Sequence, residues 1–267
     1  METNPKVFSE RTRLCSFLVL VLLCVVVSAV SPSSASLVFN FYEASCPAAE
    51  LIVSNTVRSA SSSDPTVPGK LLRLVFHDCF VEVSLFHLLN LCFVPNIIDT
   101  TFTMNEMINI FTAKGLSLED LVVLSGAHTI GSAHCSAFSD RFQEDSKGKL
   151  TPIDASLDGN YANELMQKCP VGASDSVTVF NDPKTSSSFD NQYFRNLAAH
   201  KGLFQSDSVL LNDKRTRNLV EDFANDQEKF FQSWSQSFLK LTSIGVKTGE
   251  EGEIRQSCSM TLVGEEL

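Results

Sequence analysis

The stretch KGLSLEDLVVLSGAHTIGSAHC, residues 114–135, decides the fold, because it carries a helix-start signal directly before a candidate ligand. The SLED tetrapeptide at 117–120 is a capping-box pattern, which predicts a short helix immediately after it. Ile130, His134 and Phe138 then recur every four residues. This spacing predicts that a helix continues through AHTIGSAHCSAFSDRF.

His128, in LSGAHTIG, is the candidate ligand. A lone histidine is more often structural than a ligand, but a neutral imidazole can bind a metal or haem iron. Such a ligand needs an acceptor for its other ring N–H. On a continuous helix His134 would lie about 600° further round and point away from His128. The sequence therefore does not predict a two-histidine zinc face.

Upstream, LLRLVFHDCF at 71–80 places Arg73 and His77 four residues apart, on one face of a predicted helix. One interpretation is structural, with a satisfied histidine and a surface arginine. The other is chemical, because burying an arginine in an apolar helix is costly without a purpose. A neutral imidazole can take a proton from a weak acid, and a guanidinium can stabilise the negative charge that develops as an O–O bond breaks.

Downstream, the loop NDPKTSSSFDN at 181–191 presents Asp182, Thr185 and Asp190. Clustered hard oxygen donors are typical of calcium sites. Loops rich in Asp, Ser and Thr are also ordinary turns, so the spacing alone leaves both interpretations open.

The remaining segments predict one all-α domain without a linker. Apolar residues recur at helical spacing, with DSVTVF at 175–180 as at most one short strand. Gly202 and Gly245 are the predicted stops of two helices, and Asn225-x-x-Glu228 is the predicted start of the last one. The predicted helical segments are 46–60, 70–80, 104–115, 161–169, 191–202 and 225–245.

Composition narrows the possible partners and the compartment. A net charge of −10 argues against nucleic acid and anionic membrane surfaces as main partners. Residues 1–35 combine basic residues, an apolar run at 14–30 and small residues, which predicts a cleaved secretory signal peptide, with a retained anchor as the alternative. The mature chain keeps six cysteines, so disulfides are expected, and six cysteines can pair in fifteen ways. No membrane association is expected after the signal peptide is cleaved.

Taken together, several long stretches resemble the secretory plant peroxidases, the class III haem peroxidases. The resemblance implies a helical haem-peroxidase fold, haem b and calcium, hydrogen peroxide and phenolic donors as substrates, and a monomer. It also implies secretion, to the cell wall or the vacuole, and a role in hydrogen peroxide removal and oxidative stress. The matching stretches are FYEASCPAAE at 41–50, LLRLVFHDCFV at 71–81, the opening stretch, SFDNQYFRNL at 188–197, KGLFQSDSVL at 201–210 and GEEGEIRQSC at 249–258.

The resemblance also implies roles for single residues. Arg73 and His77 match the distal pair that cleaves peroxide, and Phe76 matches the aromatic residue beside it. His128 matches the axial ligand of the haem iron. Asp207 matches the acid that accepts the N–H of this imidazole and makes it a stronger electron donor.

Calcium and disulfide positions follow from the same resemblance. Cys135 and Cys169 match a family disulfide. Asp78 and the Val81 carbonyl match part of a second, distal calcium site. The proximal calcium site is matched by Thr129, Asp182, Thr185, Ser188 and Asp190.

The chain departs from the family pattern directly after residue 82. The family continues with Gly-Cys-Asp-x-Ser, whereas residues 83–87 read VSLFH, so we expect the distal calcium site to be lost. The spacing between His77 and His128 is far shorter than in the family, which predicts a missing block. That block would carry the Asn that orients the distal histidine.

Three parts of a peroxidase domain over 36–267 are therefore expected: a distal part at 36–82, an atypical junction at 83–94 and a proximal part at 95–267. Alternatives to an active enzyme are a truncated non-catalytic member that binds haem or calcium, and an unstable splice or gene-model product. The cysteines left without a family partner are Cys46, Cys79, Cys92 and Cys258.

Overall fold

The computed structural model describes residues 37–81 and 99–246. The chain divides into two compact units, and the first, Met1–Phe39 with Lys247–Glu266, lies almost wholly outside the described residues. The predicted signal peptide and the junction at 83–94 also lie outside them, as do Cys92 and Cys258. Among the described helices, none has the length and apolar character that a membrane crossing requires.

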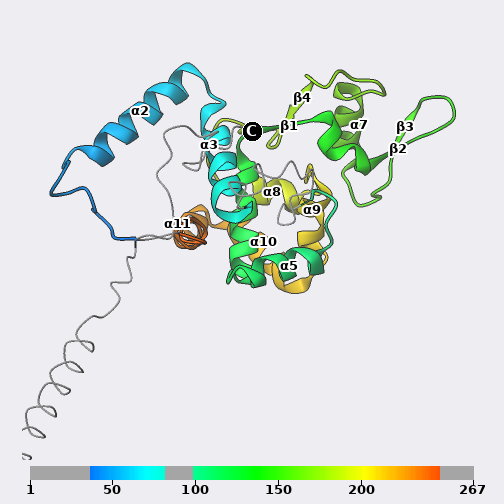
Figure 1. Ribbon diagram of the computed structural model, residues 1–267. Coiled ribbons are helices and arrows are strands. Elements are labelled where there is room, and N and C mark those ends of the chain that lie inside the picture. Colours follow the sequence, from blue (N-terminus) through cyan, green and yellow to red (C-terminus); the bar gives the residue numbers. More distant parts are fainter. Residues whose placement is uncertain (1–36, 82–98, 247–267) are drawn as a thin grey trace, which may run out of the picture. The chain divides into compact units, whose positions relative to one another are not determined.

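Helices make up most of the second unit, Asn40–Val246, as the all-α prediction requires (Figure 1). The described α-helices are α2 (Ala49–Ser63), α3 (Val67–Val75), α5 (Met104–Ala113), α6 (Leu118–Ser125), α7 (Gly159–Lys168), α8 (Gln192–Ala198), α9 (Gln205–Ser208), α10 (Lys214–Asn225) and α11 (Gln227–Thr242). The tighter or wider helical turns are the π-helix η1 (Phe76–Val81) and the 3₁₀ turns η3 (Gly126–Thr129), η4 (Cys135–Arg141) and η5 (Val209–Leu211).

The described strands form two short antiparallel pairs. Strand β1 pairs with β4, and β2 pairs with β3 in a hairpin next to η4. The strand predicted in DSVTVF is confirmed as β4. The strand bounds are β1 (Ser132–His134), β2 (Phe142–Glu144), β3 (Leu150–Pro152) and β4 (Thr178–Phe180).

The predicted helix through AHTIGSAHCSAFSDRF is wrong. After η3, Gly131 adopts φ +93°, a conformation that favours glycine, and the chain turns into β1. Strand β1 then pairs residue by residue with β4, with Ser132 opposite Phe180. The helical argument that separated His134 from His128 therefore does not apply. His134 lies instead on a short strand and is exposed.

Two predicted helix ends also differ from the structure. Helix α11 is capped by Asp226, whose carboxylate accepts the backbone N–H of Lys229, and not by Asn225. Helix α8 ends at Ala198, well before Gly202, and His200, which follows the C-cap Ala199, takes φ +58°. Gly202 has a different role, because a Cβ there would lie 3.0 Å from the Cβ of Asp207.

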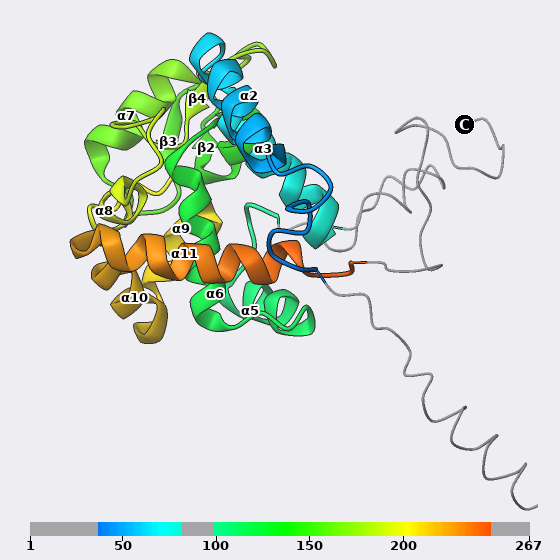
Figure 2. The same ribbon diagram turned by 90° about the vertical axis from the view of Figure 1, so that its left-hand side faces the viewer.

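Two hydrophobic clusters form the interior of this unit. In the larger one, α10 packs on α8, and α11 packs on α6, the pair that Figure 2 shows side by side. The fully buried side chains of this cluster include Phe80, Val122, Val123, Phe194, Leu210, Val220, Phe223 and Phe230. The smaller cluster joins α7, β4 and η4 and consists of Phe138, Leu157, Tyr161, Ala162, Leu165, Val179, Leu203 and Phe204.

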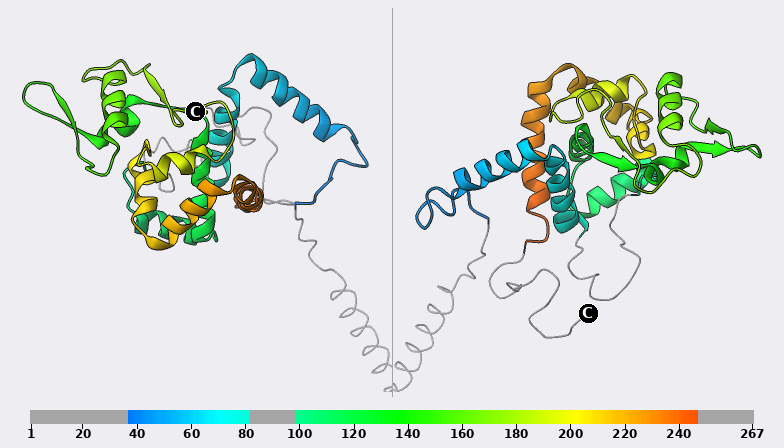
Figure 3. Two further views of the ribbon diagram at one scale, coloured as in Figure 1. Left: turned by 180° about the vertical axis from the view of Figure 1, so that it is seen from behind. Right: turned by 90° about the horizontal axis from the view of Figure 1, so that it is seen from above.

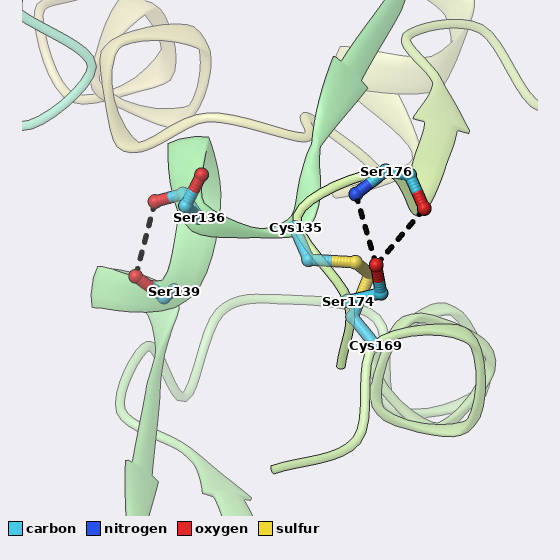
Figure 4. The surroundings of a disulfide bond; sticks show 6 residues. All are labelled: Cys135, Ser136, Ser139, Cys169, Ser174 and Ser176. Carbon is cyan, nitrogen blue, oxygen red and sulfur yellow. Dashed lines mark hydrogen bonds between the residues drawn. A yellow bond between two sulfur atoms is a disulfide. The ribbon is translucent and has the colours of Figure 1, made fainter. Parts of the chain in front are cut away.

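A disulfide between Cys135 and Cys169 links η4 to the end of α7 at the edge of the smaller cluster (Figure 4). The pairing is the one that the resemblance implies. The cysteines are 34 positions apart, and on the chain-entropy estimate such a loop stabilises the fold by about 3–4 kcal/mol. Cys46 and Cys79 are free cysteines among the described residues.

Helix α2 forms where the apolar spacing predicts a helix, and it adjoins α3 (Figure 3). It nevertheless buries none of its side chains. Leu51, Ile52 and Val53 are each more than half exposed. Helical spacing therefore identified the helix, whereas the packing that such spacing normally reflects is absent from the described part of the chain.

The first prediction concerns Asp120, which joins α6 to α11. As predicted, it closes a capping box with Ser117. Its carboxylate also accepts hydrogen bonds from Ser237 (2.7 Å) and Lys240 (2.8 Å). Burial opposes its ionisation, but these donors outweigh burial and lower the pKa of Asp120 to about 2. Because the folded pKa is depressed, this stabilisation is present above about pH 4 and is lost as the pH falls towards 2.

Asp120→Asn should lower the free energy of unfolding by roughly 2 kcal/mol at neutral pH, measured by urea denaturation. The difference from the unmodified chain should shrink between pH 4 and pH 2. Glu119→Gln, at the exposed neighbouring position of the same charge, should change stability little. Equal losses in the two variants would contradict the role of Asp120.

The second prediction concerns Gly126, the first residue of η3. A Cβ at this position would lie 2.8 Å from the Phe230 ring and 3.0 Å from the Phe194 ring. Gly126→Ala should therefore cost about 1–3 kcal/mol through overpacking, measured by thermal denaturation. Gly159→Ala is the matched control, because a Cβ there meets nothing within 4 Å. A Gly126 variant as stable as this control would refute the packing argument.

Candidate active site

His128 lies in η3, directly after α6, so the buried side chains of α6 fix its position. Its Nδ1 lies 2.9 Å from Oδ1 of Asp207, which belongs to α9. The two residues are 79 positions apart, and the fold brings them together as the resemblance implies. The imidazole is 37% exposed, whereas the Asp207 side chain is 3% exposed.

The Asp207 carboxylate accepts two further hydrogen bonds. The Tyr193 hydroxyl donates to Oδ1 at 2.9 Å, and the backbone N–H of Phe204 donates to Oδ2 at 3.0 Å. Burial opposes ionisation of this carboxyl group, but His128 and the other donors outweigh burial, so the pKa of Asp207 is lowered. Asp207 is therefore an anion at neutral pH.

An anionic acceptor at Nδ1 sets the tautomer of His128. The proton of the neutral imidazole lies on Nδ1, between the ring and Asp207, which leaves the lone pair on Nε2. Nε2 makes no hydrogen bond with any described residue. This state of the ring is the one that a metal-ligating histidine requires.

Aromatic rings from both hydrophobic clusters hold the imidazole. The Phe204 ring of the smaller cluster meets it edge-on, with centroids 5.0 Å apart. The Tyr193 ring of the larger cluster does the same at 5.9 Å. His128 thus lies where the two clusters meet, and a shift of either one would move the ring.

Arg73 and His77 lie on α3 and η1, and this segment contacts the turn that follows His128. A Cβ on Gly69 would lie 2.9 Å from the Cα of Gly131, so the two backbones touch. Gly69, Arg73 and His77 are successively four residues apart and lie along one side of the helical segment. No hydrogen bond or ion pair links Arg73 or His77 to His128 among the described residues.

Aromatic packing anchors this segment to the larger cluster. Phe80 is fully buried, and the Phe76 ring stacks on it at 5.2 Å. The Arg73 guanidinium lies 5.6 Å from the centre of the Phe76 ring, and the His77 ring meets Phe76 edge-on at 5.7 Å. Phe80, which was not predicted as a site residue, packs directly on Phe76, whereas Arg73 itself is exposed.

The electrostatics of the pair suit proton transfer. Partial desolvation, followed by the charge of Arg73, lowers the pKa of His77 below 6.5. His77 is therefore a neutral imidazole at neutral pH, able to accept a proton. Desolvation also lowers the pKa of Arg73, but a guanidinium remains a cation at neutral pH. His77 makes no side-chain hydrogen bond with another described residue.

The predicted proximal oxygen donors converge on one another. The Thr129 and Thr185 hydroxyls each donate to Oδ1 of Asp190 at 3.1 Å. Thr185 also contacts Asp182, with its hydroxyl 3.0 Å from Oδ2. Thr129 and Asp182 are fully buried. The carboxylates of Asp182 and Asp190 form no ion pair with a described cationic side chain. Ser188 belongs to the same loop, and its N–H donates to the Thr185 carbonyl at 2.8 Å.

This donor set fits a hard cation. Two carboxylates with two hydroxyls, close to one another and largely withdrawn from water, carry negative charge that a bound cation would neutralise. The distal counterpart is different. Asp78 is exposed and lies in η1 with Val81, and positions 83–87 lie outside the described residues.

Two residues near His128 were missed by sequence reasoning. Tyr193 donates to Asp207 across 14 positions, and no local spacing indicates this contact. Arg141 is 1% exposed and donates to the Gly202 and Leu203 carbonyls and to the Ser208 hydroxyl, on both sides of Asp207. A single arginine in a segment predicted as a helix gave no indication of these hydrogen bonds around Asp207.

The comparisons with known proteins identify the family of this chain. The family model described as Peroxidase matches residues 82–226. The chain is similar to Peroxidase 46 of Arabidopsis thaliana, with 49% identity over 304 residues, 87% of this chain and 93% of that protein. It is also similar to Peroxidase 18 of Arabidopsis thaliana, with 49% identity over 321 residues, 93% of this chain and 95% of the relative.

A more distant similarity extends over a comparable length. Peroxidase 66 of Arabidopsis thaliana is 33% identical over 315 residues, which span 89% of this chain and 96% of the relative. A family model that covers more than half of the chain and relatives at this level of identity establish both the family and the class of enzyme. The chain is a member of the plant secretory peroxidases.

Proposed function

We propose that the chain is a haem-dependent peroxidase that reduces hydrogen peroxide to water and oxidises phenolic donors by one electron each. The observation that carries the proposal is the 2.9 Å contact between Nδ1 of His128 and the buried Asp207, which leaves Nε2 of His128 available to a metal. The family supports haem as the cofactor, and His128 is the residue that would hold it. Bound haem would supply the redox chemistry.

The chain's own residues account for the proton transfers of this reaction. His77, neutral at neutral pH, takes a proton from the oxygen of hydrogen peroxide that binds, and returns it to the oxygen that leaves as water. Arg73 stabilises the negative charge that develops on the leaving oxygen. Two donor molecules each give up one electron and one proton, and the second oxygen also leaves as water. Asp207 accepts the hydrogen bond from the Nδ1–H group of His128 throughout.

We infer a calcium ion at the proximal oxygen cluster, held by Thr129, Asp182, Thr185 and Asp190 with the Ser188 carbonyl. Thr129 is the neighbour of His128, so an ion there would fix the turn that carries the ligand. We infer that the distal calcium site is lost, because only Asp78 and Val81 remain of its pattern. Secretion after removal of residues 1–35, a monomeric state and a role in hydrogen peroxide removal under oxidative stress belong to the same proposal.

We also infer that a block of the family sequence is missing between the distal and proximal parts. The match with Peroxidase 46 spans 304 residues, whereas 87% of a 267-residue chain is about 232 residues. About 70 residues of the relative therefore have no counterpart here. The match with Peroxidase 18 leaves a similar excess. The junction at 83–94 is where we place the loss.

A second candidate is a non-catalytic member that binds haem or calcium through its proximal part alone. The observation that favours it is that His77 makes no side-chain hydrogen bond with a described residue, so nothing described there orients the base. A misplacement near 1 Å can cost about 10²-fold in rate. The two candidates differ in turnover and not in haem binding.

The test is to express residues 36–267 with haem and calcium and to measure the Soret band and the oxidation of a phenolic donor by hydrogen peroxide. Active enzyme predicts haem uptake with turnover that falls in acid, with a midpoint below pH 6.5, because the pKa of His77 is lowered. Haem uptake without turnover would support the non-catalytic candidate. Absence of haem uptake would contradict both.

Variants assign the roles in this test. His77→Ala should lower turnover by about 10²–10⁴-fold while haem uptake persists. His128→Ala should abolish ordinary haem uptake. His134→Ala, which alters an exposed histidine six residues from His128, is the matched control and should change neither measurement. Unchanged turnover in His77→Ala would refute its role.

Calcium binding has a test of its own. Calcium should raise the melting temperature, and a concentration of 100 times Kd corresponds to about 2.7 kcal/mol. Asp182→Asn should weaken calcium binding at least tenfold in titration calorimetry, because a buried carboxylate of the cluster is lost. Asp175→Asn, at an exposed position nearby in sequence, should bind calcium as the unmodified chain does. Equal affinity in both variants would place the ion elsewhere.

A further inference from the structure

We propose that Tyr193 is a positioning residue for the proximal histidine, which limits how strongly Asp207 draws the Nδ1 proton by donating a hydrogen bond to the same carboxylate oxygen. The proposal rests on the role of His128 inferred above. It concerns a residue that acts through Asp207.

The geometry places two donors on one acceptor atom. Nδ1 of His128 and the hydroxyl of Tyr193 both lie 2.9 Å from Oδ1 of Asp207. The other oxygen, Oδ2, accepts the backbone N–H of Phe204 at 3.0 Å. A carboxylate oxygen that accepts two donors shares its negative charge between them. Each donor therefore weakens the attraction that the other one experiences.

Packing holds Tyr193 in this position. Its side chain is 3% exposed, and its ring lies 5.1 Å from that of Phe194, which is fully buried. Rotating the phenol away would leave two buried polar groups, the hydroxyl and Oδ1, with one hydrogen bond fewer. The hydroxyl therefore remains a fixed partner of Asp207.

The protonation states give the contact its direction. Burial, followed by the negative charge of Asp207, raises the pKa of Tyr193 well above 10, so the phenol keeps its proton. The pKa of Asp207 is lowered, so its carboxyl group is an anion. The 2.9 Å contact therefore joins a hydroxyl that donates to a carboxylate oxygen that accepts.

Removing this donor has a consequence of definite sign. Oδ1 becomes a stronger base towards His128, the Nδ1 proton moves towards Asp207, and the imidazole gains anionic character. A more anionic ligand binds an oxidised metal relatively more tightly than a reduced one. The midpoint potential of bound haem should therefore fall, and the bond between the metal and Nε2 should stiffen.

The chain offers a matched control in Tyr161. This tyrosine is 2% exposed and interacts with the charge of Asp207, but its hydroxyl has no hydrogen-bond partner among the described residues. Tyr161→Phe removes the same oxygen atom from a similarly buried ring without changing a donor to Asp207. A general effect of losing a buried hydroxyl would appear in both variants.

The experiment compares Tyr193→Phe, Tyr161→Phe and the unmodified chain, each loaded with haem. We expect Tyr193→Phe to have a more negative midpoint potential and a higher-frequency iron–imidazole stretch in resonance Raman spectra, and Tyr161→Phe to match the unmodified chain. Unchanged values in Tyr193→Phe, equal shifts in the two variants, or a shift of opposite sign would overturn the proposal.

A readout without haem separates this proposal from the proposed function. In the apo chain labelled with ¹⁵N-histidine, the Nδ1–H resonance of His128 should move downfield in Tyr193→Phe and stay in place in Tyr161→Phe. That result together with failed haem uptake would sink the proposed function and leave the hydrogen-bond competition standing. An unmoved resonance in Tyr193→Phe would sink the competition itself.

Discussion

A buried carboxylate that accepts the proton of an imidazole is the interaction on which the rest of this structure depends. Asp207 is almost fully buried, and an unpartnered anion there would be strongly destabilising. Three donors remove that penalty: the backbone N–H of Phe204 caps α9 itself, and His128 and Tyr193 tie α9 to η3 and α8. The contact with Asp207 fixes the orientation of His128 and places the proton of its neutral imidazole on Nδ1. Nε2 therefore keeps its lone pair.

The surroundings of this pair explain why the site keeps its shape. The Arg141 guanidinium donates to the Gly202 carbonyl before Asp207 and to the Ser208 hydroxyl after it, and Gly202 packs tightly against Asp207. Both hydrophobic clusters contribute a ring that packs against His128. The Thr129 hydroxyl belongs to the oxygen cluster and lies on the residue next to His128. The proximal half of the site is therefore supported from several directions.

The distal half has less support in the described part of the chain. Phe80 and Phe76 anchor η1 to the larger cluster, and Gly69 brings α3 against Gly131. Helix α2, which adjoins α3, buries none of its side chains. The loss of family sequence proposed for the junction would account for the exposed face of α2 and for the absence of a described hydrogen-bond partner at His77.

Local chemistry made part of this structure predictable from the sequence. The capping box before α6 needs only neighbouring residues, and helical spacing identified α5, α7 and α11. The helix predicted beyond His128 was wrong, because the pairing of β1 with β4 joins segments 46 residues apart and Gly131 permits the turn. Contacts between His128, Tyr193 and Asp207 also depend on the tertiary fold. Family resemblance supplied two of those residues, and nothing in the sequence pointed to the third.

The most direct test of the central claim is a crystal structure of residues 36–267 loaded with haem. We predict that Nε2 of His128 lies within bonding distance of the iron while Nδ1 keeps its contact of about 2.9 Å with Asp207. Iron bound to another residue, or Asp207 turned away from His128, would contradict the account.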